Sequence, residues 1–250
     1  MKYGLCHLSA VPLRSNASEK ADLVSQLIYG DHFEILDYQK NWSFIRLNYD
    51  GYEGWVDNKQ FVEISSAKAQ ELNQHHYWCS ADLIEFVTTE NHQLIPIHIG
   101  SSLAACKLLN HEFDGKSNDQ MKSYHHIVDI AVLYLNAPYV WGGKSPFGID
   151  CSGFIQVVYK ICGIKIARDS KDQAKQGRSL SFIEECKPGD LAFFDNEEGD
   201  IVHVGIMMGE NKIIHAHGQV RIDLIDHQGI FNASTREYSH KLRLLKTYND

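Results

Sequence analysis

Short runs near the start of the chain alternate between polar and apolar positions, which is the pattern of strands with one buried face. Residues 32–37 and 42–47 alternate in this way, and residues 23–28 form a third short run. Asp50-Gly51 is a hairpin-turn signal between two such runs. Short strands at this spacing, rich in aromatic and turn residues, predict a small β-barrel over residues 1–64.

The pattern weakens between residues 65 and 122. Residues 83–89 and 94–99 have the composition of strands, whereas residues 67–73 fit either a helical turn or a linker. Residues 103–109 are ambiguous between helix and strand. We therefore expect residues 65–122 to form a second, reduced β-barrel-like domain or a linker domain.

Helical periodicity appears after residue 122. Apolar side chains recur at three- and four-residue spacing in residues 123–135, and again in residues 151–162, where Gly163 is a natural stop. Between these two predicted helices, residues 138–148 form a loop rich in glycine and proline.

Strands are predicted to follow the helices. Residues 191–194 form one apolar run, and residues 201–208 and 212–216 flank a Gly-Glu-Asn turn as a hairpin. Helices followed by an antiparallel sheet indicate an α+β domain over residues 123–250. The fold class predicted for the whole chain is therefore multidomain, with small N-terminal β-barrels and a C-terminal α+β domain.

Composition and charge limit the classes of partner that the chain is expected to bind. The chain is 44% hydrophobic and 22% charged, with a net charge of −8 and no block of lysine and arginine, so a nucleic-acid partner is not expected. No stretch approaches the roughly 20 apolar residues of a membrane-spanning helix, so no membrane partner is expected. Residues 1–13 lack the apolar run of a signal peptide, and we expect a cytoplasmic protein.

Six cysteines occur in the chain, and we expect all of them to be reduced, because a chain of this size needs no disulfide staples. His75, His76 and Cys79 stand close together, but no four-ligand zinc set is completed nearby. We therefore predict neither a metal site nor an organic cofactor.

Cys151 is the candidate nucleophile. It stands where the glycine-rich loop turns into an apolar-periodic helix, and the free backbone N–H groups of a helix start stabilise a thiolate. A buried structural cysteine is the alternative interpretation. Cys162, at the far end of the same predicted helix, has no such advantage.

A nucleophilic cysteine needs a histidine base and a polar group that orients it. Side chains alternate between faces along a strand, so His203 and His215 lie on one face of the predicted hairpin. If a helix that begins with Cys151 packs on this face, His203 is the base and His215 the orienter. His217 is the alternative orienter, since it lies closer to His203 by register.

Four motifs occur in order between residues 139 and 216. They are Tyr139–Phe154, Lys187–Phe194, His203–Ile206 and Ile214–Ala216. Together they resemble the NlpC-type cell-wall peptidases, which are papain-like α+β proteins with a central antiparallel sheet. The resemblance implies that Cys151 is the nucleophile, His203 the general base and His215 the third polar residue. Motif position also assigns the oxyanion donors to the backbone N–H of Cys151 and the hydroxyl of Tyr139.

Three N-terminal segments, Val11–Arg14, Leu23–Asp31 and Asp50–Trp55, resemble the bacterial SH3-like domains of γ-D-glutamyl-L-diamino acid endopeptidases, the dipeptidyl-peptidase VI group. In that group a tyrosine and an acidic residue of the first domain, with an aspartate after the catalytic helix, hold the substrate's free amine. The resemblance implies Tyr52 and Asp169 for two of these roles. Asp22 is the choice for the acidic residue, with Glu19 and Glu53 as alternatives.

Four further residues are predicted to bind substrate by their place in the motifs. They are Ser170, Asp150, Ser152 and Trp141. A free α-amino group is charged at neutral pH, and its burial is costly unless carboxylates meet it. A substrate with an extended N-terminus would leave those carboxylates unpaired, which gives specificity by rejection.

The expected function is hydrolysis of the γ-D-glutamyl–diamino acid bond in freed muropeptides, such as L-Ala-γ-D-Glu-diaminopimelate, during peptidoglycan recycling. Two alternatives remain open from the sequence. One is an exported hydrolase or amidase that acts on polymeric peptidoglycan, and the other is a non-catalytic wall-binding protein. The complete set of Cys151, His203 and His215 argues against the second alternative.

Overall fold

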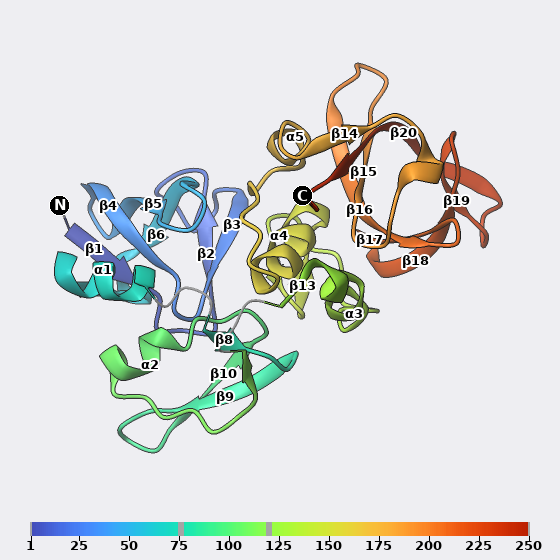
Figure 1. Cartoon of the computed structure of the whole chain (residues 1–250). Coiled ribbons are helices and arrows are strands. Elements are labelled where there is room, and N and C mark those ends of the chain that lie inside the picture. The colour runs from blue at the N-terminus through green and yellow to red at the C-terminus, as the bar shows by residue number, and fades with distance from the viewer. Residues whose placement is uncertain (1, 75–77, 119–121, 250) are drawn as a thin grey trace. The chain divides into compact units, whose positions relative to one another are not determined.

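The computed structural model describes residues 2–74, 78–118 and 122–249 and divides into two compact units (Figure 1). The N-terminal unit comprises Met1–Met121 together with Trp141–Pro146, and the C-terminal unit comprises Lys122–Val140 and Phe147–Asp250. His75 and His76, considered above as zinc ligands, lie outside the described residues. No helix within the described ranges is long and apolar enough to cross a membrane.

A seven-stranded antiparallel sheet forms the first half of the N-terminal unit, in the strand order β3-β2-β6-β5-β4-β1-β7. Its strands are β1 (Lys2–Leu5), β2 (Ala10–Arg14), β3 (Leu23–Ile28), β4 (His32–Gln39), β5 (Trp42–Leu47), β6 (Glu53–Asp57) and β7 (Val62–Ile64), with the 3-10 turn η1 (Asn58–Gln60) before β7. The alternation seen in the sequence places Phe33, Ile35, Ile45 and Leu47 in one core. The predicted strands are therefore present.

The stretch from residue 65 to 118 packs on that sheet. It contains α1 (Ser66–Gln74), β8 (Cys79–Ser80), β9 (Ile84–Thr88), β10 (Leu94–His98), α2 (Ala104–Leu109) and β11 (Ser117–Asn118). Its strands pair two by two, β9 with β10 and β8 with β11. Leu72, Val87 and Leu103 share a second core with Leu5 and Tyr29 of the first sheet. The stretch thus shares its core with the first sheet.

Residues 141–146 also belong to the N-terminal unit, where they lie against β3. The backbone N–H of Lys144, in β12 (Lys144–Ser145), donates to Gln26 Oε1 at 2.7 Å. Gly142 has a φ of +78°, and a Cβ added there would lie 2.6 Å from the carbonyl oxygen of Leu23. Only glycine permits this close approach of two backbones.

Among the described residues, the C-terminal unit contains five short or buried helices. They are η2 (Tyr124–His126), α3 (Ile127–Val132), α4 (Cys151–Ile161), α5 (Ser170–Gln173) and η3 (Ile183–Glu185). The first predicted helix is shorter than expected, because the backbone tightens after Val132 and Asn136 adopts a φ of +69°. The second was predicted well: α4 begins at Cys151 and ends at a turn where Gly163 has a φ of +72°.

The antiparallel sheet of the C-terminal unit closes on itself. Its strands are β14 (Arg178–Leu180), β15 (Leu191–Asp195), β16 (Ile201–Gly209), β17 (Lys212–His217), β18 (Gln219–Ile225), β19 (Gly229–Asn232) and β20 (Glu237–Thr247), while β13 (Gly148–Ile149) lies before α4. The order is β14-β20-β15-β16-β17-β18-β19, and β19 also pairs with β20. The orange and red strands of Figure 1 therefore form a ring around an apolar core.

Candidate active site

Cys151 is the first residue of α4, and a buried ion pair fixes the start of this helix. The Asp150 side chain caps the helix by accepting the backbone N–H of Gly153 at 2.6 Å. Arg168 donates to both carboxylate oxygens of Asp150, at 3.0 and 2.6 Å, and to Ser152 Oγ at 2.9 Å. The side chains of Asp150 and Ser152 are thus committed to holding Cys151 in place.

The Cys151 thiol is buried and rests in its protonated form. Burial, and then the negative charge of Asp150, raise its pKa to about 12, although hydrogen bonds from the backbone of Val204 and Ser152 and the charge of Arg168 act in the opposite direction. The helix start was expected to lower this pKa, but burial outweighs it. A base must therefore remove the proton when the sulfur attacks. Val204, the hydrogen-bond partner of the thiol, directly follows His203 in β16.

A chain of hydrogen bonds links His203 to a buried carboxylate. His203 Nε2 lies 2.8 Å from His215 Nδ1, and His215 Nε2 lies 2.9 Å from Asp223 Oδ2. Arg221 donates to both oxygens of Asp223, at 2.6 and 2.8 Å. The sheet register builds this chain, because Gly205 of β16 stands opposite His215 of β17, which stands opposite Arg221 of β18.

The Asp223 carboxylate sets the direction of every hydrogen bond in this chain. An ionised Asp223 only accepts, so His215 carries its proton on Nε2 and its Nδ1 is an acceptor. His203 must then donate from Nε2, which leaves the lone pair on His203 Nδ1. This neutral tautomer has its basic nitrogen free of the histidine chain, as a general base requires.

The ionisation states agree with this arrangement. Burial, and then the neighbouring histidines, hold the pKa of His203 well below its usual range, and burial also lowers the pKa of His215. Burial tends to raise the pKa of Asp223, but hydrogen bonds from His215 and Arg221 outweigh it and lower the value to about 2. Two neutral imidazoles and one carboxylate therefore coexist at neutral pH.

The two candidate orienters behave differently. His215 is buried and hydrogen-bonded to His203, whereas His217 is exposed and its ring lies edge-on to His203, with centroids 6.4 Å apart. Register alone favoured His217, but the diagonal neighbour on the next strand makes the hydrogen bond. The structure therefore brings His203 and His215 together.

Three residues of this cluster were missed from the sequence. Asp223 and Arg221 could have been found by extending the register of the hairpin one strand further, to β18. His240 gave no local signal, because its strand β20 lies beside β15, which is far away along the chain. The His240 ring stacks on that of His203, with centroids 4.1 Å apart and planes at 23°.

Three other predicted residues, Tyr139, Asp169 and Ser170, lie in the C-terminal unit. The hydroxyl of Tyr139 stays protonated, because burial and then the nearby Cys151 and Asp150 raise its pKa to about 12, so it can act as a donor. Asp169 is half-buried at the start of α5, next to Ser170. Burial raises the pKa of Asp169, while the charge of Arg168 partly offsets this.

The remaining predicted residues lie in the N-terminal unit. Tyr52 is half-buried against the core of the first sheet, and Asp22 is exposed in the turn before β3. Of the alternatives, Glu53 is paired with Arg46 at 2.7 Å and Glu19 is exposed. Trp141 is 69% exposed.

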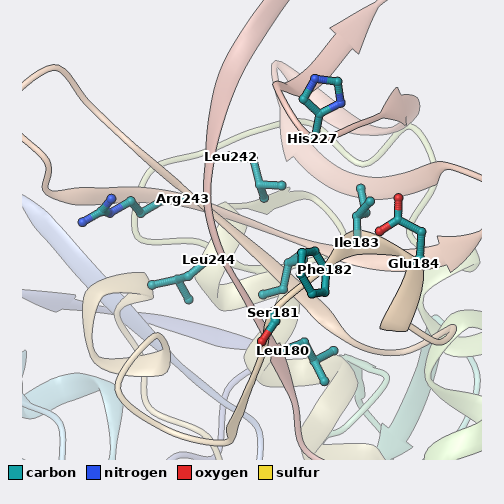
Figure 2. Close-up of a pocket in the computed structure, with 10 residues that line it drawn as sticks. Leu180, Ser181, Phe182, Ile183, Glu184, His227, Leu242, Arg243 and Leu244 are labelled. Carbon is teal, nitrogen blue, oxygen red and sulfur yellow. The ribbon is translucent and has the colours of Figure 1, made fainter.

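A separate pocket of about 450 Å³ lies on the C-terminal unit (Figure 2). Phe182, Leu242 and Leu244 contribute apolar walls, and Glu184, His227 and Arg243 contribute polar groups. None of the predicted site residues is among the described residues that line this pocket.

Two stretches of the chain match known families. Residues 136–238 match the NlpC/P60 family, and residues 13–61 match the bacterial dipeptidyl-peptidase SH3 domain. Residues 136–238 are an NlpC/P60 domain. Both the resemblance found in the motifs and the predicted fold class are confirmed by these matches, since the SH3-type domain precedes the papain-like α+β domain.

Relatives of this NlpC/P60 peptidase include two named dipeptidyl-peptidases. The gamma-D-glutamyl-L-lysine dipeptidyl-peptidase of Bacillus subtilis (strain 168) is 42% identical over 40% of this chain and 34% of that protein. Dipeptidyl-peptidase 6 of Lysinibacillus sphaericus is 27% identical over 83% of this chain and 86% of that protein. An NlpC/P60 family structure from Bacillus cereus ATCC 10987 has a TM-score of 0.77 at 19% identity and covers 98% of this chain and 99% of its own, which shows a shared fold.

Proposed function

We propose that this NlpC/P60 peptidase hydrolyses the γ-D-glutamyl–diamino acid bond of free muropeptides that begin with L-Ala. The observation that carries the proposal is the buried chain from His203 through His215 to Asp223, next to Val204, whose backbone is hydrogen-bonded to the Cys151 thiol. The names of the Bacillus subtilis and Lysinibacillus sphaericus relatives support the dipeptidyl-peptidase assignment.

The proposed reaction starts from a neutral thiol and a neutral imidazole. His203 Nδ1 takes the proton of Cys151 as the sulfur attacks the γ-carbonyl carbon of D-Glu. The oxyanion that forms accepts hydrogen bonds from the backbone N–H of Cys151 and the hydroxyl of Tyr139. The His203 imidazolium then protonates the amine of the diamino acid, which leaves, and a thioester remains on Cys151.

Hydrolysis of the thioester completes the proposed cycle. His203 Nδ1 removes a proton from water, the hydroxide oxygen attacks the thioester carbonyl, and the proton returns to the departing sulfur. Throughout, His215 and Asp223 hold the His203 tautomer that keeps Nδ1 basic. The products are L-Ala-γ-D-Glu and the freed diamino acid.

Recognition of the substrate's free amine is the second part of the proposal. We assign Tyr52, Asp22 and Asp169 to the ammonium. A charged amine loses its hydration when it enters a binding site, and this is costly unless carboxylates replace the lost water. Ser170 and Trp141 are proposed to contact the rest of the peptide. Asp150 and Ser152 would contribute backbone groups, since Arg168 occupies their side chains. We propose that the peptidase acts on such freed peptides in peptidoglycan recycling, in the cytoplasm.

Mass spectrometry of the products tests reaction, bond and end recognition together. The substrates are L-Ala-γ-D-Glu-diaminopimelate and its L-Lys counterpart, each with a free and with an acetylated N-terminus. We expect L-Ala-γ-D-Glu from the free peptides only, and no product with Cys151→Ala. Equal cleavage of acetylated peptides or of polymeric peptidoglycan would favour the polymer-acting alternative. An intact free tripeptide with the folded wild-type protein would contradict the proposed function.

A further inference from the structure

Three imidazoles from three different strands converge at the edge of the histidine chain. Within the described residues, the ligand nitrogens of His203, His215 and His240 lie within 4.8 Å of one another. The closest pair, His203 Nε2 and His215 Nδ1, is 2.8 Å apart. Ligand nitrogens of a tetrahedral zinc site are about 3.4 Å apart, given Zn–N bonds near 2.0–2.1 Å. Small side-chain adjustments would therefore give a three-nitrogen site.

The second nitrogens of two of these imidazoles already carry the partners that metal-bound histidines use. His215 Nε2 is hydrogen-bonded to Asp223, which Arg221 holds in turn. His240 Nδ1 lies 2.9 Å from Ser239 Oγ. Such outer partners fix the ring orientation and direct the other nitrogen toward an ion. They leave His215 Nδ1 and His240 Nε2 as ligand atoms.

The ligand atoms of this cluster are all imidazole nitrogens, contributed by His203, His215 and His240. Three neutral imidazole nitrogens and no carboxylate oxygen form a ligand set that suits zinc and similar transition metals rather than Mg²⁺ or Ca²⁺.

We propose that His203, His215 and His240 form a binding site for a divalent transition metal, with Zn²⁺ as the fitting ion, and that its occupation inhibits the peptidase. The chemistry of inhibition follows from the tautomer. To bind metal through Nε2, a neutral His203 must carry its single N–H proton on Nδ1, and its hydrogen bond to His215 is broken. The proton therefore moves from Nε2 to Nδ1, and the basic nitrogen that faces the reaction is lost.

Metal binding can be measured apart from catalysis. The full-length Cys151→Ala protein removes the thiol as a competing ligand, and calorimetry with Zn²⁺ should show one site. His240→Gln in that background should weaken Zn²⁺ binding by at least about tenfold. His227→Gln, a histidine in the loop between β18 and β19, is the matched control and should bind Zn²⁺ like its parent. Equal Zn²⁺ affinity with and without His240, in proteins of matching circular dichroism, would overturn the proposal.

Two further measurements identify the side chains that bind the metal and test whether the metal inhibits the peptidase. Co²⁺ in place of Zn²⁺ should give the visible absorption of a tetrahedral nitrogen site with the parent and lose it with His240→Gln. In the protein with Cys151 intact, Zn²⁺ should stop thiol alkylation and peptide cleavage reversibly, and His240→Gln should need at least about tenfold more Zn²⁺ for the same effect. Inhibition that is unchanged by His240→Gln would place the metal on the thiol alone and overturn the proposal.

Discussion

At the scale of single residues, Asp223 determines where the protons of the site lie. It is buried, ionised and held by Arg221, and it can only accept from His215. Each hydrogen bond in the chain then has a single direction, ending at the lone pair of His203 Nδ1. A residue that touches no reacting atom thus controls the basicity of the one that does.

Asp223→Asn should lower kcat more than it changes KM. An amide can donate to His215 and reverse the direction of the chain, which puts the proton of His203 on the wrong nitrogen. We expect kcat to fall by about 10²- to 10⁴-fold, measured by product release from the free tripeptide. Asp200→Asn, at an exposed loop carboxylate, should keep the wild-type kcat. An unchanged kcat in a folded Asp223→Asn protein would contradict this role.

The same substitution should change the dependence of stability on pH. The pKa of Asp223 is lowered to about 2, so its ionised form stabilises the fold above the unfolded value near 4, and this is lost as pH falls toward 2. A shift of this size corresponds to about 2 kcal/mol of unfolding free energy at pH 7. Urea unfolding of wild type and Asp223→Asn should therefore differ at pH 7, approach each other below about pH 4 and converge near pH 2. A difference that persists at low pH would exclude the charge as its cause.

At the scale of elements, the start of α4 is held by a buried ion pair. Arg168 and Asp150 are almost fully buried, and Arg168 also reaches Ser152 on the other side of Cys151. Such a pair adds little net stability relative to apolar residues, but removal of one partner leaves the other as an unpaired buried charge. In this protein the ion pair fixes the position of the Cys151 thiol.

Arg168→Gln should destabilise the protein by about 3–5 kcal/mol, because it leaves the Asp150 carboxylate buried without its countercharge. The measurement is urea unfolding, with the alkylation rate of Cys151 as a second readout of the helix start. Lys175→Gln removes an exposed ion pair with Asp172 and should cost less than about 1 kcal/mol. Similar losses for the two variants would show that the Arg168 pair does not support the site.

Gly205 in β16 leaves room for the orienting histidine. A Cβ added there would lie 2.7 Å from Ile213 Cδ1 and 3.0 Å from His215 Cβ. Gly205→Ala should therefore cost about 1–3 kcal/mol and displace His215, with a loss of kcat. Val202→Ala, at an exposed position of the same strand, is the control. Full activity of Gly205→Ala would mean that Ile213 alone yields and that His215 does not move.

The sequence predicted the elements that local signals define. The loop-to-helix step placed Cys151, and the alternation across the hairpin turn placed His203 and His215 on one face. Asp223 was missed because the hairpin register was not extended to the next strand, β18. His240 was missed because its strand, β20, lies beside β15, which is far away along the chain. The protonated resting state of the Cys151 thiol was not predicted, for a different reason. The helix start was visible in the sequence, but the burial that raises the pKa of the thiol comes from tertiary packing.

At the scale of the whole molecule, the N-terminal unit has two cores that are joined across its predicted domain boundary. Leu5 and Tyr29 of the first sheet pack with Leu72 and Leu103 of the following stretch. Tyr29 Oη also lies 3.0 Å from His111 Nδ1. The stretch that the sequence left ambiguous is therefore stabilised by the first sheet, and the first sheet by it.

Leu103→Ala should destabilise both parts of this unit. The side chain is fully buried, so its truncation should cost about 2–5 kcal/mol. Hydrogen exchange should accelerate in β1 and β4 as well as in β9 and β10, because the parts share a core. Leu94→Ala, at a leucine that is 64% exposed, should leave exchange unchanged. Acceleration confined to β9 and β10 would indicate two independent folding units.

The closure of the C-terminal sheet has a consequence for the order in which the protein matures. β20 comes last among the strands, yet it pairs with β14, β15 and β19 and carries the imidazole that stacks on His203. While the chain is still being made on the ribosome, the hairpin of β16 and β17 can form, but the ring around it cannot. Long-range pairings of this kind form slowly. The nascent peptidase should therefore remain inactive until β20 has emerged.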